Sequence, residues 1–155
     1  MRVAVASDHA GFPLKQTVID TLIDLGHTPV DLGTHSTDSV DYPDYAKEAG
    51  LRIVNGDVER AIVLCGSGVG ACIAANKIVG VYASVCHDTY TAAQGVEHDH
   101  MNMLCLGARV IGPELAVHIV KAFISAAPSD EPRHLRRVGK IREIEVTQLK
   151  GKNYE

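Results

Sequence analysis

The stretch Ala61-Ile62-Val63-Leu64-Cys65-Gly66-Ser67-Gly68-Val69-Gly70 decides the fold of this chain. Its first half is apolar, rich in branched residues and stopped by glycines, which predicts a buried strand entering a tight turn. Small, helix-compatible residues continue to position 77, so we expect the turn to open a helix. Such a turn points backbone N–H groups and the positive end of the helix dipole at one spot, where an anion is stabilised. A thiolate is stabilised there for the same reason, and Cys65 occupies this position.

Outward from this stretch, short apolar segments alternate with amphipathic ones. Segments that predict buried strands span residues 3–6, 29–33, 61–64, 81–86 and 103–106. Segments that predict helices span residues 13–25, 42–54, 69–77, 89–95, 113–127 and 135–149. Strands and helices that alternate with short connections predict a parallel sheet with helices on both faces. The expected fold class is α/β: a three-layer α/β/α sandwich with a five-stranded parallel sheet, Rossmann- or flavodoxin-like, plus a C-terminal helix.

Length and composition limit the classes of partner. The 155 residues suffice for a sizeable core, and we expect a single domain over residues 1–155 with a flexible tail at 150–155. A formal net charge of −4, with 5% aromatic residues and no Trp, argues against a nucleic-acid partner. No apolar stretch is long enough to span a membrane, and the first residues predict a strand rather than a signal peptide. The four cysteines lack metal-finger spacing, which indicates reduced thiols in the cytoplasm.

Ligands of parallel sheets bind beyond the carboxyl ends of the strands. The loops expected at that edge are 8–9, 65–70, 87–88 and 107–109. Asp8 either caps the next helix or takes part in proton transfer, and the adjacent His9 could contact a phosphate; the residues alone leave these readings open. Three cysteines inside apolar segments are expected only to fill space: Cys72, Cys86 and Cys105.

The glycine turn has a second interpretation. Gly66-x-Gly68-x-x-Ala71 fits the dinucleotide fingerprint, and Asp88 follows at the end of the next expected strand. Against this, the turn follows the third strand rather than the first, a cysteine precedes it, and no room remains for a substrate domain. A dinucleotide-binding regulatory module is therefore the alternative from a different functional class.

The stretch Glu97-His98-Asp99-His100 has the composition of a metal site. In an extended chain His98 and His100 would share one face, but no third ligand lies nearby in the sequence. We therefore expect no metal and favour His98 as a general acid or base, because imidazole titrates near neutral pH.

The stretch Arg133-His134-Leu135-Arg136-Arg137 is the one dense basic cluster of the chain. It is either a solvated helix start or a phosphate site. Arg133 and Arg137 stand one helical turn apart and could hold a single phosphate, with Arg109 joining them.

Six motifs occur in order over nearly the whole chain. They are Ser7-Asp8-His9-Ala10-Gly11, Asp41-Tyr42-Pro43, Cys65 to Gly70 with Ile73 to Lys77, Glu97-His98, Gly107-x-Arg109-Val110-Ile111-Gly112, and Arg133-His134-x-x-Arg137. Together they resemble the ribose-5-phosphate isomerase B family of sugar-phosphate isomerases, which includes the galactose-6-phosphate isomerase subunits. The resemblance implies an aldose–ketose isomerase acting on ribose 5-phosphate or, alternatively, on allose 6-phosphate or galactose 6-phosphate.

The resemblance also implies roles for individual residues. Cys65 matches the base that moves a proton between C2 and C1 through an enediolate; some members use a glutamate just beyond the turn, where this chain has Ala71 and Cys72. His98, with Asp8 as a partner, matches the group that opens the furanose ring. The enediolate oxygens would be held by Ser67 and the backbone N–H groups of Gly66, Gly68, Val69 and Gly70.

The remaining implied roles concern substrate binding and assembly. The phosphate set comprises His9, Arg109, Arg133 and Arg137, and Tyr42 lines the sugar. In this family the site lies between two subunits, which implies a homodimer, alone or paired into a tetramer, without metal or organic cofactor. One position departs from the family: Asp99 stands where an asparagine is common, and its carboxylate would oppose an enediolate unless it is paired or turned toward a sugar hydroxyl.

Overall fold

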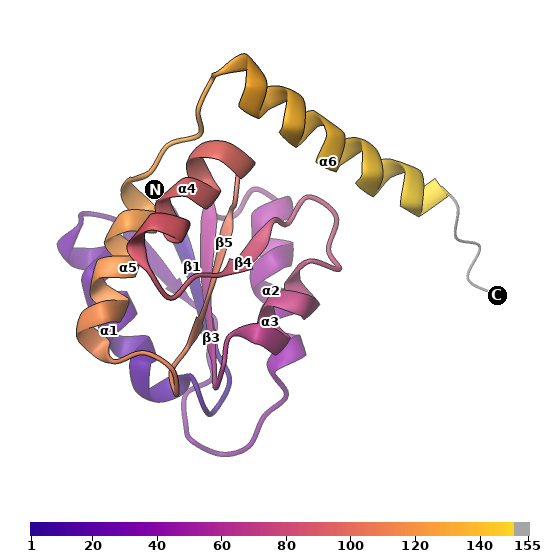
Figure 1. Cartoon of the computed structure of the whole chain (residues 1–155). Coiled ribbons are helices and arrows are strands. Elements are labelled where there is room, and N and C mark those ends of the chain that lie inside the picture. Colours follow the sequence, from indigo (N-terminus) through magenta and orange to yellow (C-terminus); the bar gives the residue numbers. More distant parts are fainter. Residues whose placement is uncertain (151–155) are drawn as a thin grey trace.

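The structure, a computed structural model, describes residues 1–150. The part of the predicted flexible tail from residue 151 onward lies outside the described residues. Five strands form one sheet: β1 Arg2–Ser7, β2 Thr28–Asp31, β3 Arg60–Cys65, β4 Ala83–Val85 and β5 Met103–Gly107. The helices are α1 Phe12–Asp24, α2 Tyr42–Val54, α3 Val69–Ala75, α4 Thr89–Asp99, α5 Pro113–Ser125 and α6 Pro132–Lys150. All strand pairs are parallel in the order β2-β1-β3-β5-β4, so the predicted fold class is confirmed (Figure 1).

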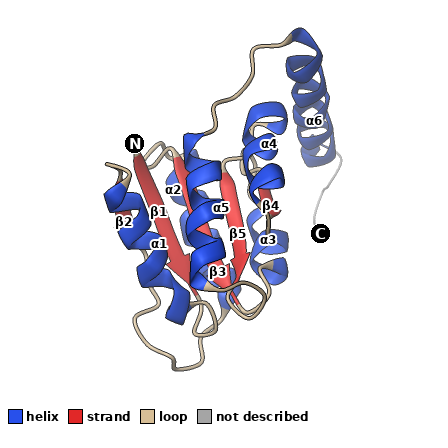
Figure 2. Cartoon of the chain, turned by 60° about the vertical axis from the view of Figure 1, so that its left-hand side comes forward, coloured by secondary structure: helices blue, strands red, loops and turns tan. Residues whose placement is uncertain are grey.

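The helices cover the sheet in two layers (Figure 2). One core cluster packs α1, α4 and α5 against Val3, Val5, Ile62 and Leu64 of the central strands. The other packs α2 and α3 against the alternate residues of the same strands, Val63 and Cys65 among them. Successive strand residues point to opposite faces of a sheet, so each central strand serves both cores. This alternation along β3 places the Cys65 side chain on the face that α2 and α3 cover.

The α2–α3 layer is built from small side chains. Its fully buried members include the alanines Ala4, Ala6, Ala46, Ala49, Ala61, Ala71 and Ala75. A layer of alanines brings helix backbones close to the sheet, and close-packed interiors leave little room for movement. The turn between β3 and α3 is therefore held on a tightly packed support.

Several element boundaries differ from the predicted ones. The fourth strand is shorter than the predicted 81–86; just before it, the Tyr82 N–H donates to the Asn102 side chain at 2.8 Å rather than to a neighbouring strand. The predicted helix 89–95 extends to Asp99, where His100 ends it in the left-handed region with φ 57°. The last helix begins at Pro132, a residue suited to a first helical turn, rather than at 135.

Helix α6 extends away from the body of the molecule (Figures 1 and 2). Its beginning is packed through the buried His134 and Val138. Farther along, Ile144 and Val146 are 62% and 48% exposed, while the Glu145 carboxylate accepts from Gly80 N at 3.0 Å. Within residues 1–150, no helix has both the length and the apolar character needed to cross a bilayer.

An ion pair between the buried Lys15 and the partly exposed Asp31 fixes α1 to the sheet edge. The Lys15 ammonium, whose side chain is 4% exposed, donates to the Asp31 carboxylate at 2.7 and 2.9 Å and to the Thr34 carbonyl at 2.6 Å. Burial raises the pKa of Asp31, but hydrogen bonds from Lys15 and the Gly33 N–H outweigh it, so the pKa lies below its ordinary value of 3.8. An acid with a lowered pKa stabilises the fold above its unfolded-state pKa, and this stabilisation is lost as pH falls through the folded-state pKa.

We expect Asp31→Asn to lower the free energy of unfolding by about 2 kcal/mol at pH 7, because it leaves a buried ammonium without its counter-charge. The difference from the wild type should shrink as the pH falls from about 4 through the lowered folded-state pKa of Asp31, because the wild-type carboxylate is then protonated as well. Urea unfolding from pH 3 to pH 7 measures it. The control is Asp57→Asn, whose exposed partner Arg52 lies at 3.5 Å and which should change stability by less than about 0.5 kcal/mol. A difference independent of pH would contradict this account.

Candidate active site

The three central strands end side by side, and backbone hydrogen bonds join their ends. The N–H of Asp8 donates to the Leu64 carbonyl at 3.1 Å, which ties the end of β1 to β3. On the other side, the N–H groups of Ala108 and Arg109 donate to the carbonyls of Cys65 and Gly66 at 2.9 and 3.0 Å. The glycine turn is therefore held from both neighbouring strands.

Glycine is required at two positions of this junction, one in the turn and one at the end of β5. Gly68 has φ +82°, a left-handed conformation that other residues rarely adopt. At Gly107 a Cβ atom would lie 2.7 Å from the backbone carbonyl of Ser67, closer than real Cβ contacts come. The loop after β5 can thus reach the turn only because Gly107 has no side chain.

An open hollow of about 420 Å³ lies at these strand ends. Its lining residues are Asp8, His9, Ala10, Tyr42, Cys65, Gly66, Ser67, Gly70, Arg109 and Val110. The structure therefore brings together eight of the predicted site residues, from four separate segments of the sequence. Gly68 and Val69 continue the same turn.

The Cys65 side chain lies in this hollow although it is only 4% exposed. The backbone N–H of Gly68 donates to its sulfur at 3.0 Å. The sulfur is thus oriented by the turn and still reachable from the hollow. Ser67 is exposed beside it, and its hydroxyl accepts from the Val69 N–H at 3.3 Å.

Asp8 and His9 both have defined backbone partners. One Asp8 carboxylate oxygen accepts from the N–H groups of Ala10 and Gly11, at 2.9 and 2.8 Å, so Asp8 holds the turn that leads into α1. It does not cap the helix itself, whose N-cap residue is Gly11 and which has no side-chain cap. The Nδ1 atom of His9 accepts from the Val40 N–H at 3.2 Å. A neutral ring with Nδ1 as acceptor carries its proton on Nε2, which remains available as a donor.

Tyr42 and Arg109 form two walls of the hollow. The Tyr42 ring packs so closely on Gly70 that a Cβ atom there would lie 2.6 Å from it, and Tyr42 remains 40% exposed. The Arg109 side chain passes beside Gly66, with Cδ 3.5 Å from the position of a Cβ atom. A guanidinium, a phenol and an imidazole N–H thus surround the thiol.

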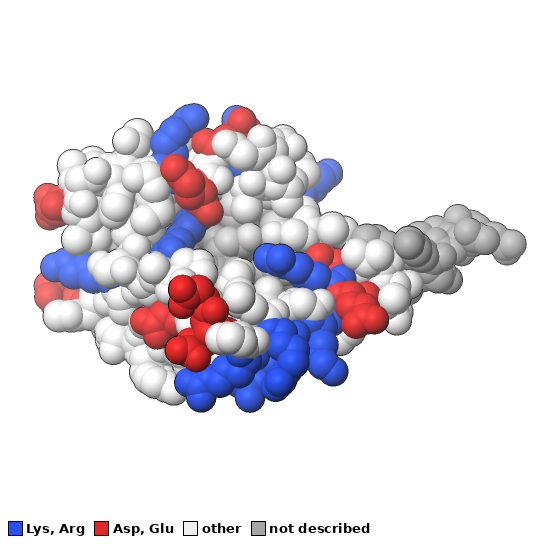
Figure 3. Space-filling model, turned by 90° about the horizontal axis from the view of Figure 1, so that it is seen from above, with Lys and Arg blue, Asp and Glu red and all other residues white. Residues whose placement is uncertain are grey.

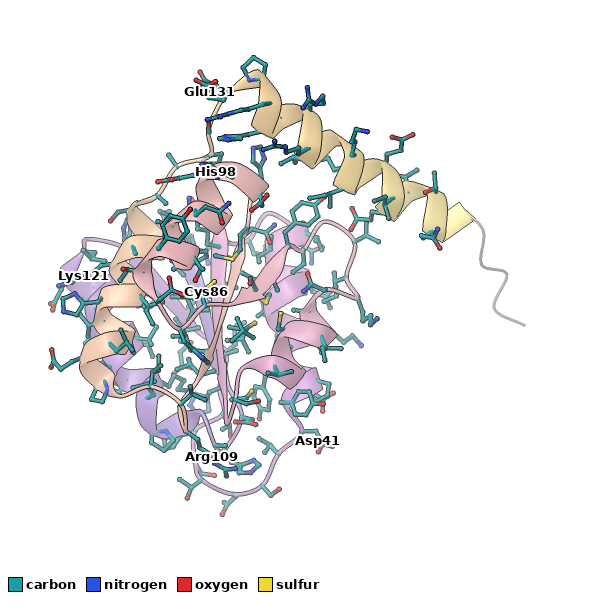
Figure 4. All side chains as sticks on the ribbon, viewed as in Figure 1. Asp41, Cys86, His98, Arg109, Lys121 and Glu131 are labelled. Carbon is teal, nitrogen blue, oxygen red and sulfur yellow. The ribbon has the colours of Figure 1, made fainter. Side chains whose placement is uncertain are left out.

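The other predicted residues lie at the opposite end of the same chain. Figure 4 shows His98 near the start of α6 and Arg109 beyond the far end of the sheet. Because α4 runs back along the sheet, its last residues lie near the strand starts. Arg133 and Arg137 belong to the exposed basic beginning of α6, the dense group of Lys and Arg side chains seen in Figure 3. One protomer therefore does not bring Cys65 together with His98, Asp99, Arg133 and Arg137.

His98 and His134 stack at this second end, with ring centroids 3.9 Å apart. Burial lowers the pKa of His134, and the neighbouring His98, Arg133 and Arg137 lower it further. The Nδ1 atom of His134 is buried without a hydrogen-bond partner in the described chain. His134 is therefore an uncharged support for the His98 ring.

The structure contradicts the extended conformation on which the metal interpretation of His98 and His100 was based. Residues 97–99 are helical rather than extended, so His98 and His100 do not share one face of a strand. Within residues 1–150, no group of three His, Cys, Asp or Glu side chains is placed to hold a metal ion. The dinucleotide reading also lacks its acidic partner, because Asp88 caps α4 through Thr91 N at 2.8 Å and β5 separates β4 from β3.

Two residues at this second end had no role assigned from the sequence. Gln94, which contacts His98, was missed because the predicted helix stopped at residue 95; its i, i+4 spacing would have signalled the contact. His134 was quoted as part of the basic cluster, but nothing in the sequence places it against α4.

The cysteines are all free thiols. Cys86 and Cys105 are buried as predicted, and the pKa of each thiol is raised. Burial is the main cause for Cys86. For Cys105 the contact with Cys72 is the main cause, and burial adds to it. Cys72 is half-buried, and its contacts with Cys105, the Val85 backbone and Asn76 lower its pKa to about 7 against the effect of burial.

Gly107→Ala should lower the free energy of unfolding by about 1–3 kcal/mol, because the added methyl meets the Ser67 backbone and overpacks the junction of β5 and the turn. Gly112→Ala is the matched control: it lies in the same loop with φ −89° and has open space around its Cβ position. It should leave stability unchanged or slightly raised. Thermal and urea unfolding of both variants measure the difference, and equal effects would show that the close approach is unimportant.

Comparison with known proteins identifies the family to which this sequence and fold are similar. The model of the Ribose/Galactose Isomerase family matches residues 3–141. The chain is 41% identical over 144 residues to ribose-5-phosphate isomerase B of Escherichia coli, covering 93% of this chain and 96% of the relative.

Solved structures agree with this match. The structure of ribose-5-phosphate isomerase B from Clostridium thermocellum superposes with a TM-score of 0.91 at 42% identity, covering 96% of this chain and 99% of the other. That of Mycoplasma genitalium, with bound ribulose-5-phosphate, gives 0.86 at 37% identity, covering 94% and 96%. The chain belongs to the Ribose/Galactose Isomerase family.

Proposed function

We propose that this protein is an aldose–ketose isomerase that interconverts ribose 5-phosphate and ribulose 5-phosphate, a reaction of the pentose phosphate pathway. The observation that carries the proposal is the Cys65 sulfur, held by the Gly68 N–H in a hollow whose walls include Arg109 and His9. Ribulose-5-phosphate bound to the Mycoplasma genitalium relative supports a five-carbon substrate over allose 6-phosphate or galactose 6-phosphate. The four free thiols support a cytoplasmic location.

The turn supplies both parts of the proton transfer. Cys65 removes the proton from C2 of the open-chain aldose and returns it to C1. The intermediate enediolate carries negative charge on its oxygens, and donors already aimed at that charge stabilise it without reorganisation. The exposed Ser67 hydroxyl is such a donor, as are the N–H groups of this turn other than those of Gly68 and Val69, which donate to the Cys65 sulfur and the Ser67 hydroxyl.

The residues proposed to bind the phosphate lie at two opposite ends of the fold. His9 and Arg109 lie beside the thiol, whereas Arg133 and Arg137 lie at the beginning of α6. A homodimer brings the second pair from one protomer to the hollow of the other. Apolar side chains suited to such an interface are exposed near each half: Val69 and Ile73 on α3 are 52% and 58% exposed, and Ile144 on α6 is 62% exposed.

His98 opens the sugar ring in this scheme. Ribose 5-phosphate is closed through O4, so C2 cannot be deprotonated until the bond between C1 and O4 breaks. Ribulose 5-phosphate is open, because the oxygen that would close its five-membered ring carries the phosphate. Proton exchange at C1 of ribulose 5-phosphate therefore needs the thiol but no ring opening, which separates the two roles experimentally.

Cys65→Ala should reduce turnover of ribose 5-phosphate by at least about 10³-fold, because it removes the base. Deuterium uptake at C1 of ribulose 5-phosphate in D₂O, followed by NMR, should fall equally. Cys72→Ala is the matched control, since Cys72 contacts Asn76 and the Ala83 carbonyl outside the hollow; it should retain both activities within about twofold. Substantial turnover by Cys65→Ala, or none by the wild type, would refute the mechanism.

Mixing inactive variants tests whether the site is shared. Cys65→Ala and Arg137→Ala are each expected to be poorly active, but a mixed dimer carries both lesions in one site and none in the other. Co-refolded equimolar chains should therefore regain about a quarter of wild-type activity, since half of the randomly formed dimers are mixed and each has one intact site. Mixing Cys65→Ala with Cys65→Ser, which damage the same half, should give no such recovery. Failure of the first mixture would show that Arg137 does not serve the Cys65 hollow of a partner chain.

A further inference from the structure

We propose that Gln94 is a positioning residue that holds His98 in the tautomer with its proton on Nε2, and that Asp99 sets the orientation of the Gln94 amide. The consequence for catalysis rests on the ring-opening role proposed above for His98. The tautomer itself is a property of the free protein and is tested separately.

The contact comes from the spacing along α4. Gln94 and His98 are one helical turn apart, and the Gln94 Nε2 atom lies 3.0 Å from His98 Nδ1. The same Nε2 atom lies 3.2 Å from Asp99 Oδ2. An amide nitrogen carries two hydrogens, so it satisfies both acceptors at once.

Asp99 decides which way the amide faces. An ionised carboxylate only accepts hydrogen bonds. If the Gln94 amide rotated by half a turn, its oxygen would face the Asp99 carboxylate and the hydrogen bond would become a repulsion. The nitrogen end therefore stays toward Asp99 and, with it, toward His98. This pairing also gives a use to the aspartate that stands where an asparagine is common in the family.

The amide orientation then decides where the His98 proton lies. Because the Gln94 N–H points at Nδ1, this atom must be the acceptor, and the proton of the neutral ring lies on Nε2. Within residues 1–150, no side chain or backbone group hydrogen-bonds to Nε2. The ring therefore offers an N–H to a bound sugar and has no lone pair free to act as a base. It polarises the ring oxygen O4 as a donor.

The charged groups around His98 are mixed in sign. On α4 these are Glu97 and Asp99, and the segment before α6 brings Ser129 N to the Glu97 carbonyl at 2.8 Å, with Glu131 next to the start of α6. From α6 come Arg133 and Arg137, and the stacked His134, whose pKa is lowered by burial and these cations. With carboxylates and guanidiniums on either side, the direct hydrogen bond from Gln94 is the contact that selects one ring nitrogen over the other.

The direct test is a long-range ¹H–¹⁵N spectrum of the full-length protein near pH 8.5, where imidazoles are neutral. The wild type should show His98 protonated on Nε2. Gln94→Glu has nearly the same shape but only accepts, so the His98 proton should move to Nδ1. A wild-type proton on Nδ1, or a spectrum unchanged by Gln94→Glu, overturns the proposal.

The kinetic test uses the same variant and Gln94→Leu. Turnover of ribose 5-phosphate should fall by at least about tenfold, while deuterium uptake into ribulose 5-phosphate stays within about threefold, because that exchange needs no ring opening. Gln16→Glu alters a comparable pair, since Gln16 Nε2 donates to Asp20 at 2.8 Å on the distant α1, and should change neither. Equal loss of both activities would reduce Gln94 to a structural role. If the wild type performs neither reaction, the proposed function fails while the spectrum still decides the tautomer.

Discussion

The junction where the loop after β5 crosses the glycine turn is the constraint on which this site depends. Two backbone hydrogen bonds, from Ala108 and Arg109 to Cys65 and Gly66, hold the turn in place. Gly107 permits the approach because its missing Cβ leaves room for the Ser67 backbone. The junction orients the Cys65 sulfur and at the same time brings the Arg109 guanidinium beside it. The sulfur proposed as the base and its charged neighbour are thus brought together by main-chain geometry.

The same fold separates the remaining functional groups from this junction. In a parallel sheet each connecting helix returns to the strand starts, and α4 therefore carries His98 away from the Cys65 hollow. A fold of this kind concentrates residues from strand ends well, but it leaves residues from helix ends on the opposite side. Assembly of two copies is the direct way to bring both sets to one substrate, and the exposed apolar residues of α3 and α6 fit that role.

Much of this arrangement follows from local sequence. The run 61–70 contains the buried strand, the turn and the thiol, and alternation of such runs was enough to predict the five-stranded sheet. Side chains at the carboxyl ends of β1, β3 and β5 meet because adjacent parallel strands end at one edge, so Asp8, Cys65 and Arg109 could be grouped without coordinates. What could not be predicted depended on non-local contacts. The stacking of His134 on His98 depends on the path of residues 126–131. The Gln94 contact depends on α4 continuing past Gly95, and tertiary packing rather than local helix propensity determines where that helix ends.

The layer of alanines beneath the turn has a consequence for how this enzyme can change over evolution. Seven fully buried alanines and the close approach of the Tyr42 ring to Gly70 characterise the layer under the thiol, so larger side chains there would overpack it. At the other end, Arg133, Arg136 and Arg137 stand on the exposed side of α6, where a change of side chain meets few packing restraints. Under the proposed function, new substrate lengths are therefore most readily accommodated by changing these arginines of α6, while the residues around Cys65 stay fixed.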